Sequence, residues 1–340
     1  MCPRSLVSAS VAGHTDLVHA ADSAATAVAP GKGRGFSADL MYAAATLYYL
    51  EDVTQAEVAA QLKVSRATVS RLLSEARRQG IVRIEVVSPA GPADTDLAAR
   101  TADALGLRAV HLAGSAAGSG ATLSPALSAA LVRVGLQPGE ILLVSTGRTV
   151  YEAVRAELPQ LPGVLLAPTI GGQDESEPWY QSNEIIREAA ARVGGRPTFL
   201  YAPALPGRKL YRSLLGDPST RRVLALWENA RCVVLGVGGA PLTRASIPGF
   251  VPTDAVSLRE AVGDVCSRFY DRDGRPVAFP GNDRLMAIGL EVLQRVPVGI
   301  AVAFGAEKVG GIVAGARAGY FNELVTDTST AELLSRATPP

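Results

Sequence analysis

A short polar segment near the middle of the chain lies between an apolar run and a helical pattern. It consists of Ser145, Thr146, Gly147, Arg148 and Thr149, within LLVSTGRTVYEAV. Free backbone amides at a helix start, hydroxyl groups and a guanidinium together favour binding of a phosphate or another anion. A plain strand-to-helix turn with Thr149 as its N-cap explains the same residues about equally well.

Other predicted strand ends also carry polar residues. Lys308, in IAVAFGAEKVGG, falls in the first turn of a predicted helix, where a lysine opposes the helix dipole unless an anion neutralises it. Gly171, Gly172 and Gln173 follow another strand and would add a polar wall. Asp264, in GDVCSRFYD, would accept hydrogen bonds from sugar hydroxyls. Ordinary turn chemistry, or an exposed lysine, is the alternative at each position.

A further strand end, VVLGVGGAP, carries Gly236, Gly238 and Gly239 in a tight-turn pattern. It is a poor dinucleotide fingerprint, because the full G-x-G-x-x-G is absent and Pro241 follows at once. No acidic residue closes the next strand at the expected distance. The sequence therefore predicts no nucleotide cofactor.

A different chemistry, recognition of DNA, is indicated between Thr54 and Leu73, TQAEVAAQLKVSRATVSRLL. Apolar residues recur there at the spacing of two short helices joined by a tight turn, the helix-turn-helix pattern. The small Ala59 lets the two helices approach. Lys63 occupies the turn position where glycine is common, so its backbone must take a strained or different geometry. The buried positions are Val58, Ala59, Leu62, Val64, Val69 and Leu72.

The solvent face of the second helix supplies the groups that would meet a DNA groove. Between residues 55 and 83 the chain has six basic and two acidic side chains, a local charge of +4 in a chain of net charge +1. Phosphate backbones select such patches, although an ordinary helical hairpin with an arginine-rich surface is the alternative. The predicted DNA-contacting residues are Ser65, Arg66, Thr68, Ser70 and Arg71.

Length and composition set the frame for these sites. A chain of 340 residues with 48% hydrophobic content has room for a small and a large domain. Three cysteines without metal-ligand spacing argue against a disulfide framework, and no apolar run approaches the ~20 residues of a membrane span. We therefore expect a cytoplasmic protein with no membrane partner.

The N-terminal third divides into two predicted regions. Residues 1–35 form a disordered extension, in which His14 and His19 are solvated rather than a metal pair. Residues 36–88 form the all-α helix-turn-helix domain: a helix over 36–50 capped by Ser37, two capped helices, and a strand or wing over 81–87. Gly80 ends the second motif helix.

Residues 89–340 are predicted to form an α/β domain for effector binding and oligomerisation. Alternating helices and apolar runs imply a mostly parallel sheet covered by helices on both faces. DRDGRPV predicts a hairpin turn at Asp273 and Gly274. The predicted strands are 108–112, 141–145, 164–167, 198–201, 232–237 and 300–304; the predicted helices include 94–105, 123–134, 182–193 and 219–229.

Several of these motifs together resemble the SorC family of bacterial sugar-responsive transcriptional regulators. They include SRATVSRLLSEAR, STGRTVYEA, PTIGG, VVLGVGG, GDVCSRFYDRDGRPV, GAEK and LVTD, within residues 37–335. The resemblance implies a homotetrameric repressor or activator whose large domain has the sugar-phosphate isomerase and CoA-transferase type of fold. It also implies that the loop 145–149 and Lys308 surround the phosphate of a phosphorylated sugar.

An enzyme on the same fold, a sugar-phosphate isomerase or CoA-transferase with a DNA-binding appendage, is the alternative class. Such chemistry needs a poised acid and base or a carboxylate nucleophile. The candidates are Asp264, Asp283 and Glu307, and His111 lies on a predicted buried strand. The sequence favours a non-catalytic regulator with double-stranded operator DNA and a phosphorylated sugar as its partners.

Overall fold

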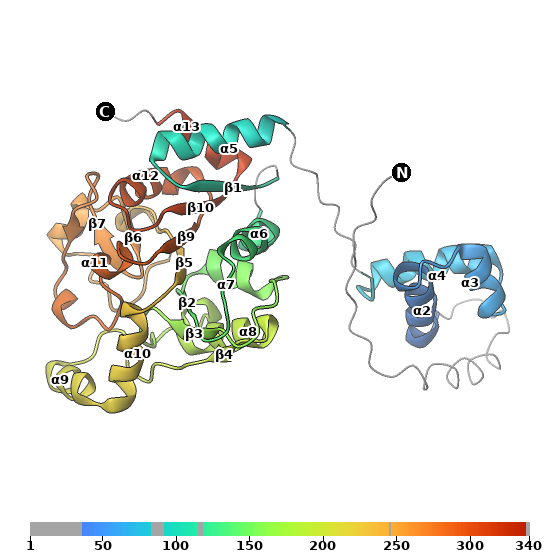
Figure 1. The fold of residues 1–340 in the computed structure, drawn as a ribbon, viewed down its shortest axis with the longest axis horizontal. Helices are drawn as coiled ribbons and strands as arrows, with labels where there is room; N and C mark the ends of the chain where they lie inside the picture. The colour runs from blue at the N-terminus through green and yellow to red at the C-terminus, as the bar shows by residue number, and fades with distance from the viewer. Residues whose placement is uncertain (1–35, 83–91, 115–117, 245, 338–340) are drawn as a thin grey trace. The chain divides into compact units, whose positions relative to one another are not determined.

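The computed structural model divides the chain into two compact units, Met1–Val87 and Ser88–Pro340 (Figure 1). It describes residues 36–82, 92–114, 118–244 and 246–337. The predicted extension over 1–35, with His14 and His19, lies outside the described residues, as does most of the predicted wing over 81–87.

The small unit is helical throughout its described part. Helix α2 (Ala38–Ala45) continues into a π-helical turn, η1 (Thr46–Leu50), and is followed by α3 (Gln55–Gln61) and α4 (Arg66–Arg78). Each predicted cap is present: the side chains of Ser37, Thr54 and Ser65 accept from backbone amides three residues on, and Thr54 completes a capping box. Gly80 follows α4 with φ +76°.

The core of the small unit confirms the predicted helix-turn-helix packing. Val58 and Ala59 of α3, Val69 and Leu72 of α4, and Met41 of α2 are buried together. Half-buried Leu62 and Val64 pack against the same core.

The turn between α3 and α4 takes an unusual conformation at Lys63. Its φ is +53°, in the left-handed region that usually favours glycine. The sequence predicted either a strained or a different geometry at this position, and the strained left-handed backbone is the one present. The side chain of Lys63 is exposed.

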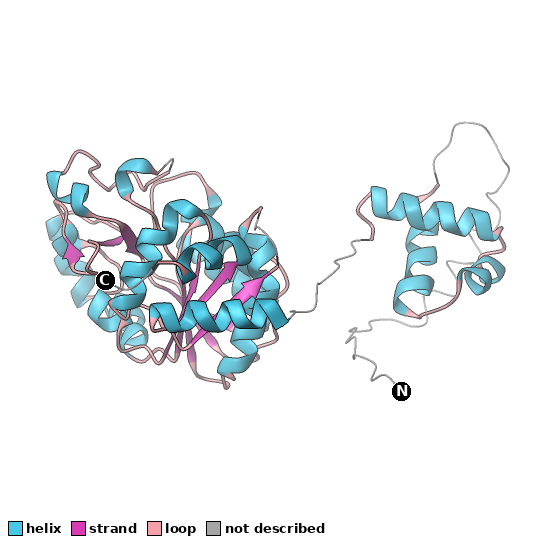
Figure 2. Cartoon of the chain, turned by 90° about the horizontal axis from the view of Figure 1, so that it is seen from above, coloured by secondary structure: helices cyan, strands magenta, loops and turns pink. Residues whose placement is uncertain are grey.

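The large unit is built on a parallel sheet of seven strands in the order β1-β10-β9-β5-β2-β3-β4. Figure 2 shows helices on both sides of the strands. The strands are β1 (Ala109–Ala113), β2 (Ile141–Val144), β3 (Leu165–Pro168), β4 (Arg196–Pro197), β5 (Cys232–Gly236), β9 (Val298–Val302) and β10 (Glu323–Asp327). The helices are α5 (Pro92–Leu105), α6 (Ser124–Val134), α7 (Arg148–Arg155), α8 (Ser182–Val193), α9 (Arg208–Gly216), α10 (Pro218–Glu228), α11 (Leu290–Leu293), α12 (Val309–Arg317) and α13 (Thr328–Ser335).

Alternate residues of the central strands enter two different cores. Leu143 and Val233 pack in the core that also holds apolar residues of α5, α10 and α12, whereas Leu142 and Val234 pack with α6, α7 and α8. Side chains of a strand point to opposite faces in turn, so these two cores are the two faces of the sheet. The predicted architecture is confirmed.

The strand order reverses at the centre of the sheet. The reversal lies between β5 and β2. Strands β3 and β4 lie beyond β2, whereas β9, β10 and β1 lie beyond β5. In open α/β sheets the crevice beside such a reversal, at the carboxyl ends of the strands, is where ligands bind. Here it lies after Val144 and Gly236.

A second, antiparallel sheet contains β6 (Gly263–Val265), β7 (Arg268–Tyr270) and β8 (Pro276–Val277). The hairpin predicted from DRDGRPV joins β7 to β8, with Gly274 at φ +78°. The turn from β6 to β7 consists of Cys266 and Ser267, whose φ angles are +51° and +59°.

Two predictions for the sheet need correction. The strand predicted over 198–201 is wrong: ladder pairing covers only Arg196 and Pro197. Beyond them the chain leaves the sheet edge, and the side chain of Asn183 holds both the N–H and the C=O of Leu200. Strand β10 is absent from the predicted strands, although all five of its residues are buried.

Candidate functional site

The exposed side of α4 carries the residues predicted to contact DNA. Arg66, Ser70 and Arg71 are exposed, while the opposite side of the helix is buried. The Arg71 guanidinium lies over the ring of Phe36, 5.3 Å from its centroid. This contact restricts the direction of the arginine before any DNA arrives.

Ser65 and Thr68 have a local role at the start of the same helix. The Ser65 hydroxyl accepts from the Thr68 amide at 3.1 Å and shares a 2.8 Å hydrogen bond with the Thr68 hydroxyl. Farther along, Arg78 bonds to Glu75 and lowers the pKa of that carboxyl to about 2. Among the described residues neither Arg66 nor Arg71 forms an ion pair with a carboxylate, so their charges remain available for phosphates or bases.

In the large unit a cavity of about 190 Å³ lies at the carboxyl ends of β2, β5 and β9. Residues far apart in the chain meet there because the parallel strands end at the same edge. The polar and glycine residues that line it are Thr146, Gly147, Arg148, Thr149, Tyr180, Gly236, Gly238, Arg244, Ser246, Asp264, Ser267 and Lys308.

The first wall of this pocket is the loop that enters α7. Gly147 is the N-cap, with φ +122° and no side chain to bond the amides of the first turn. Thr149 is therefore not the cap. The pocket faces Thr146, Gly147, Arg148 and Thr149. The Gly147 amide donates to the Trp179 carbonyl at 2.9 Å, so the anion site begins with the first amides of α7 and the Thr146 and Thr149 hydroxyls.

Ser145 has a different position from its four successors. It is buried, its hydroxyl donates to the Thr146 carbonyl at 3.0 Å, and it accepts from the Gly236 amide at 3.1 Å. The residue ties the end of β2 to the end of β5 rather than lining the cavity.

Gly171, Gly172 and Gln173 also lie behind the pocket wall. A Cβ at Gly171 would meet the Ala202 carbonyl oxygen at 2.5 Å, so backbone packing requires glycine there. Gly172 pairs with Pro203 in a parallel bridge. The buried amide of Gln173 donates to the Thr146 hydroxyl at 3.1 Å and leaves its own oxygen without a hydrogen-bond partner.

Lys308 approaches the loop from the opposite side. It ends the 3-10 turn η7 (Ala306–Lys308) and is the N-cap of α12. Its ammonium donates to the Thr149 hydroxyl at 3.2 Å and lies 5.5 Å from the Phe304 ring centroid. Burial lowers the pKa of this lysine. A cation held beside a helix start favours an incoming anion.

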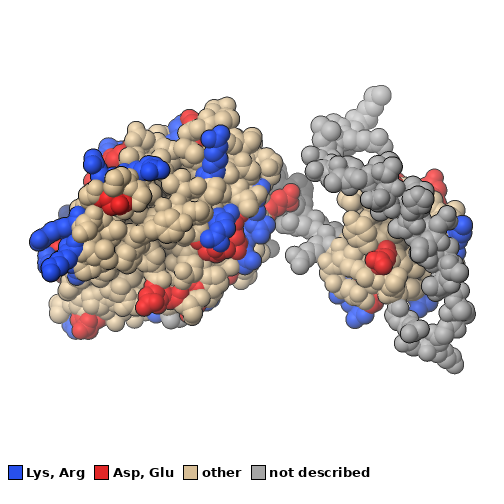
Figure 3. Space-filling view, turned by 90° about the horizontal axis from the view of Figure 1, so that it is seen from below, with Lys and Arg blue, Asp and Glu red and all other residues tan. Residues whose placement is uncertain are grey.

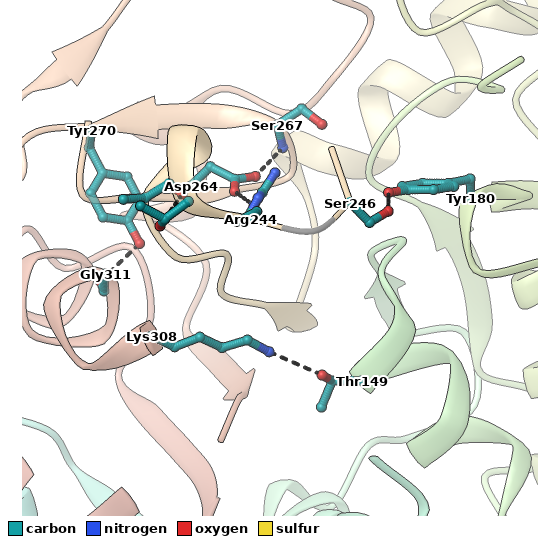
Figure 4. Close-up of polar contacts among 11 residues, drawn as sticks. Thr149, Tyr180, Arg244, Ser246, Asp264, Ser267, Tyr270, Lys308 and Gly311 are labelled. Carbon is teal, nitrogen blue, oxygen red and sulfur yellow. Dashed lines mark hydrogen bonds and ion pairs between the residues drawn. The ribbon is translucent and has the colours of Figure 1, made fainter. Parts of the chain in front are cut away.

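Asp264, at the β6 hairpin, also lines the pocket. Its carboxylate pairs with Arg244 and accepts from the Ser267 amide at 3.1 Å. The buried Tyr270 hydroxyl donates to the Gly311 carbonyl at 3.0 Å and fixes the hairpin on α12 (Figure 4). Asp264 is therefore held rigidly at the cavity.

Sequence reasoning missed several pocket residues that come from loops and short turns. Arg244 and Ser246 follow β5, and Trp179 lies in η3 (Pro178–Tyr180), where Arg148 stacks 4.4 Å from its ring centroid. Ser246 shares a 2.5 Å hydrogen bond with Tyr180. No periodic pattern marks such loop positions; an arginine shortly after the glycine-rich strand end was the available signal.

The candidate acid and base residues for an enzyme are dispersed. Asp283 is exposed beside Arg208, Glu307 is exposed, and only Asp264 lines the pocket. His111 bonds Glu323 at 2.9 Å, on neighbouring strands. In the described part of the chain no group of three metal-ligating side chains is found, and no helix there is long and apolar enough to cross a bilayer.

Comparison with known families identifies both units. Residues 92–335 match the family described as "Putative sugar-binding domain", and residues 46–79 match region 4 of sigma-70. The first match covers the whole sheet with its pocket, and the second covers the helix-turn-helix.

Related proteins match over most of their length. The chain is 32% identical over 305 residues to the sorbitol operon regulator of Klebsiella pneumoniae, covering 85% of this chain and 95% of the relative. It is 32% identical over 302 residues to the deoxyribonucleoside regulator of Bacillus subtilis, covering 86% and 95%.

A solved structure shares the fold as well. The crystal structure of the full-length regulator SorC from Klebsiella pneumoniae matches with a TM-score of 0.72 and 31% identity, over 89% of this chain and all of that one. These relatives are transcriptional regulators, which decides against the enzyme alternative. The chain therefore belongs to the SorC family of sugar-responsive regulators and is a DNA-binding transcriptional regulator.

Proposed function

We propose that a phosphorylated sugar binds in the pocket at the strand ends and controls binding of the protein to its operator. The observation that carries this proposal is the Lys308–Thr149 contact of 3.2 Å, which joins two anion-favouring features 159 residues apart. A phosphate would accept from the Lys308 ammonium, the Thr149 hydroxyl and the first amides of α7 together.

The charge of the pocket agrees with an anionic ligand. Arg148, Arg244 and Lys308 line it against one carboxylate, that of Asp264. On the face seen in Figure 3, charged side chains of both signs are scattered over the large unit with uncharged areas between them. The local excess of cations at the pocket favours binding of an anion there.

A thermal-shift experiment tests this assignment. The full-length protein is mixed with matched sugars and sugar phosphates, and ligand binding to the folded state raises the unfolding midpoint. We expect a phosphorylated sugar to raise it more than its unphosphorylated counterpart, and Lys308→Gln to remove most of that difference. Lys209→Gln, at an exposed lysine of α9, is the matched control. Equal shifts by both ligands in wild type would contradict the proposal.

The other assignments complete this proposal. The small unit reads a double-stranded operator through α4, and the unit 88–340 forms a homo-oligomer, a tetramer by family resemblance, so that paired motifs meet paired half-sites. The protein acts in the cytoplasm, where the chromosome of a bacterium lies. A gel-shift titration with the stabilising sugar phosphate measures the coupling; an operator affinity that the effector leaves unchanged would refute effector control.

A further inference from the structure

The two ends of the pocket differ in their charge balance. At one end Lys308 contacts the Thr149 hydroxyl, and no carboxylate of the described residues lies within ion-pair distance of its ammonium. At the other end Arg244 pairs with Asp264, and their side chains are only 18% and 11% exposed. Figure 4 shows the two contacts apart from each other. One end therefore presents a lysine that forms no direct ion pair among the described residues, and the other a directly paired arginine and aspartate.

The Arg244–Asp264 pair packs tightly against the surrounding backbone. A Cβ at Gly238 would lie 2.0 Å from the Asp264 carboxylate and 1.9 Å from the Arg244 guanidinium, so the pair packs directly on that glycine. The second carboxylate oxygen accepts from the Ser267 amide at 3.1 Å. Moving Arg244 to another anion would leave Asp264 charged, buried and without its counter-ion, which is strongly unfavourable.

The atoms that remain available at this pair fit a hydroxyl group. Arg244 lines the cavity and its side chain is 18% exposed, so its guanidinium can donate a hydrogen bond to a ligand there. The neighbouring carboxylate offers acceptor sites. A hydroxyl donates to one and accepts from the other, whereas a phosphate or carboxylate only accepts and is repelled by Asp264.

We propose that the Arg244–Asp264 pair restricts the effector to sugars with a single anionic group, excluding bisphosphates and sugar acids with a second negative charge at that end. This inference rests on the proposed binding of a phosphorylated sugar. The cavity of about 190 Å³ agrees with it, because it is smaller than the roughly 300–1,000 Å³ of pockets for drug-sized ligands and suits one small sugar.

Matched ligand pairs test the proposal on the full-length protein. The probes are glucose 6-phosphate against glucose 1,6-bisphosphate, fructose 6-phosphate against fructose 1,6-bisphosphate, and ribulose 5-phosphate against ribulose 1,5-bisphosphate, measured by calorimetry. We expect the best monophosphate to bind wild type at least about tenfold more tightly than its bisphosphate, because of the like charge of Asp264.

Two variants separate the roles of the paired residues. Asp264→Asn frees Arg244 for a second anion and should improve the affinity for the bisphosphate relative to the monophosphate by about tenfold or more. Arg244→Gln leaves the carboxylate unneutralised and should widen the preference for the monophosphate. Asp283→Asn, which removes the exposed partner of Arg208, is the control and should leave the ratio unchanged.

The outcomes distinguish failure of the monophosphate selectivity from failure of phosphosugar binding itself. A wild type that binds a bisphosphate as tightly as its monophosphate, or an unchanged ratio in both pocket variants, overturns the inference and leaves phosphosugar binding intact. If no sugar phosphate in the set binds wild type, both the inference and the proposed function fail. The Arg244→Gln result remains informative if Asp264→Asn does not fold.

Discussion

Lys308 costs stability in the free protein. Burial lowers its pKa, which means that the charged form is less favourable in the folded chain than in the unfolded one. We predict that Lys308→Met raises the thermal midpoint without ligand while abolishing the preference for phosphorylated sugars. Differential scanning calorimetry checks it; Lys209→Met, at an exposed site, should change neither property.

The same lysine should make both the stability of the protein and its phosphate affinity depend on pH, each in a defined direction. Its folded pKa lies below the ordinary 10.5, so between these two values the unfolded chain holds more protons. The free energy of unfolding therefore rises with pH across that window, and phosphate affinity falls as the ammonium loses its proton. In the Lys308→Met protein the free energy of unfolding and the phosphate affinity should no longer change with pH in this window. If both change as in the wild type, other groups cause the dependence.

Arg66 and Arg71 are the residues whose loss should most affect operator recognition. Replacing either with alanine should weaken binding to the specific operator by roughly 1–3 kcal/mol if it contacts a guanine edge, and weaken random DNA less. Arg78→Ala is the control, because Arg78 already bonds Glu75. If both variants bind the specific and the scrambled duplex as the wild type does, α4 is not the DNA-contacting helix.

At the level of elements, the β6–β7 turn holds strain at the pocket. Two non-glycine residues, Cys266 and Ser267, occupy left-handed backbone, which costs roughly 1–2 kcal/mol each. We predict that Ser267→Gly raises the midpoint by about 2–4 °C, since the turn geometry is kept. Ser257→Gly, in an exposed 3-10 turn without positive φ, should not raise it. A lower midpoint for Ser267→Gly would show that its side chain outweighs the strain.

Local patterns predicted most elements of this fold. The caps at Ser37, Thr54 and Ser65 and the apolar runs of the central strands follow from nearest-neighbour chemistry, so the sequence alone identified them. The prediction misplaced strand β4 because tertiary contacts decide where the edge strand ends. Here the side chain of Asn183 bonds the backbone of Leu200 and holds it away from the sheet ladder. Such a limit has no signature in the segment itself.

The site was predictable where it lies at strand ends or within a recognised motif. Thr146 to Thr149 and Lys308 line the cavity because parallel strands bring their ends together, whereas Asp264 reaches it from β6 of the antiparallel sheet. Arg244 and Trp179 come from irregular loops, whose paths depend on contacts with Asp264 and Arg148. Gln173 supports Thr146 from behind instead of facing the ligand space, a distinction that only coordinates reveal.

For the whole molecule, assembly is predicted to take place through the large unit. Residues 88–340 have their own buried interior on both sheet faces, so this part is expected to fold and to associate alone. Light scattering on the isolated 88–340 protein should give a mass of at least two chains, because paired DNA-reading modules require it. A monomer at every concentration would place the interface elsewhere.

The stacking of Arg148 on Trp179 provides an optical reporter for the whole molecule. The chain has two tryptophans: Trp227 is buried with its indole N–H bonded to the Pro168 carbonyl, whereas Trp179 lines the pocket beneath a guanidinium. An effector that attracts Arg148 would change the surroundings of one indole and leave the other as an internal reference. Intrinsic emission should therefore follow effector occupancy without any added dye, and Trp179→Phe should silence the response while Trp227→Phe retains it.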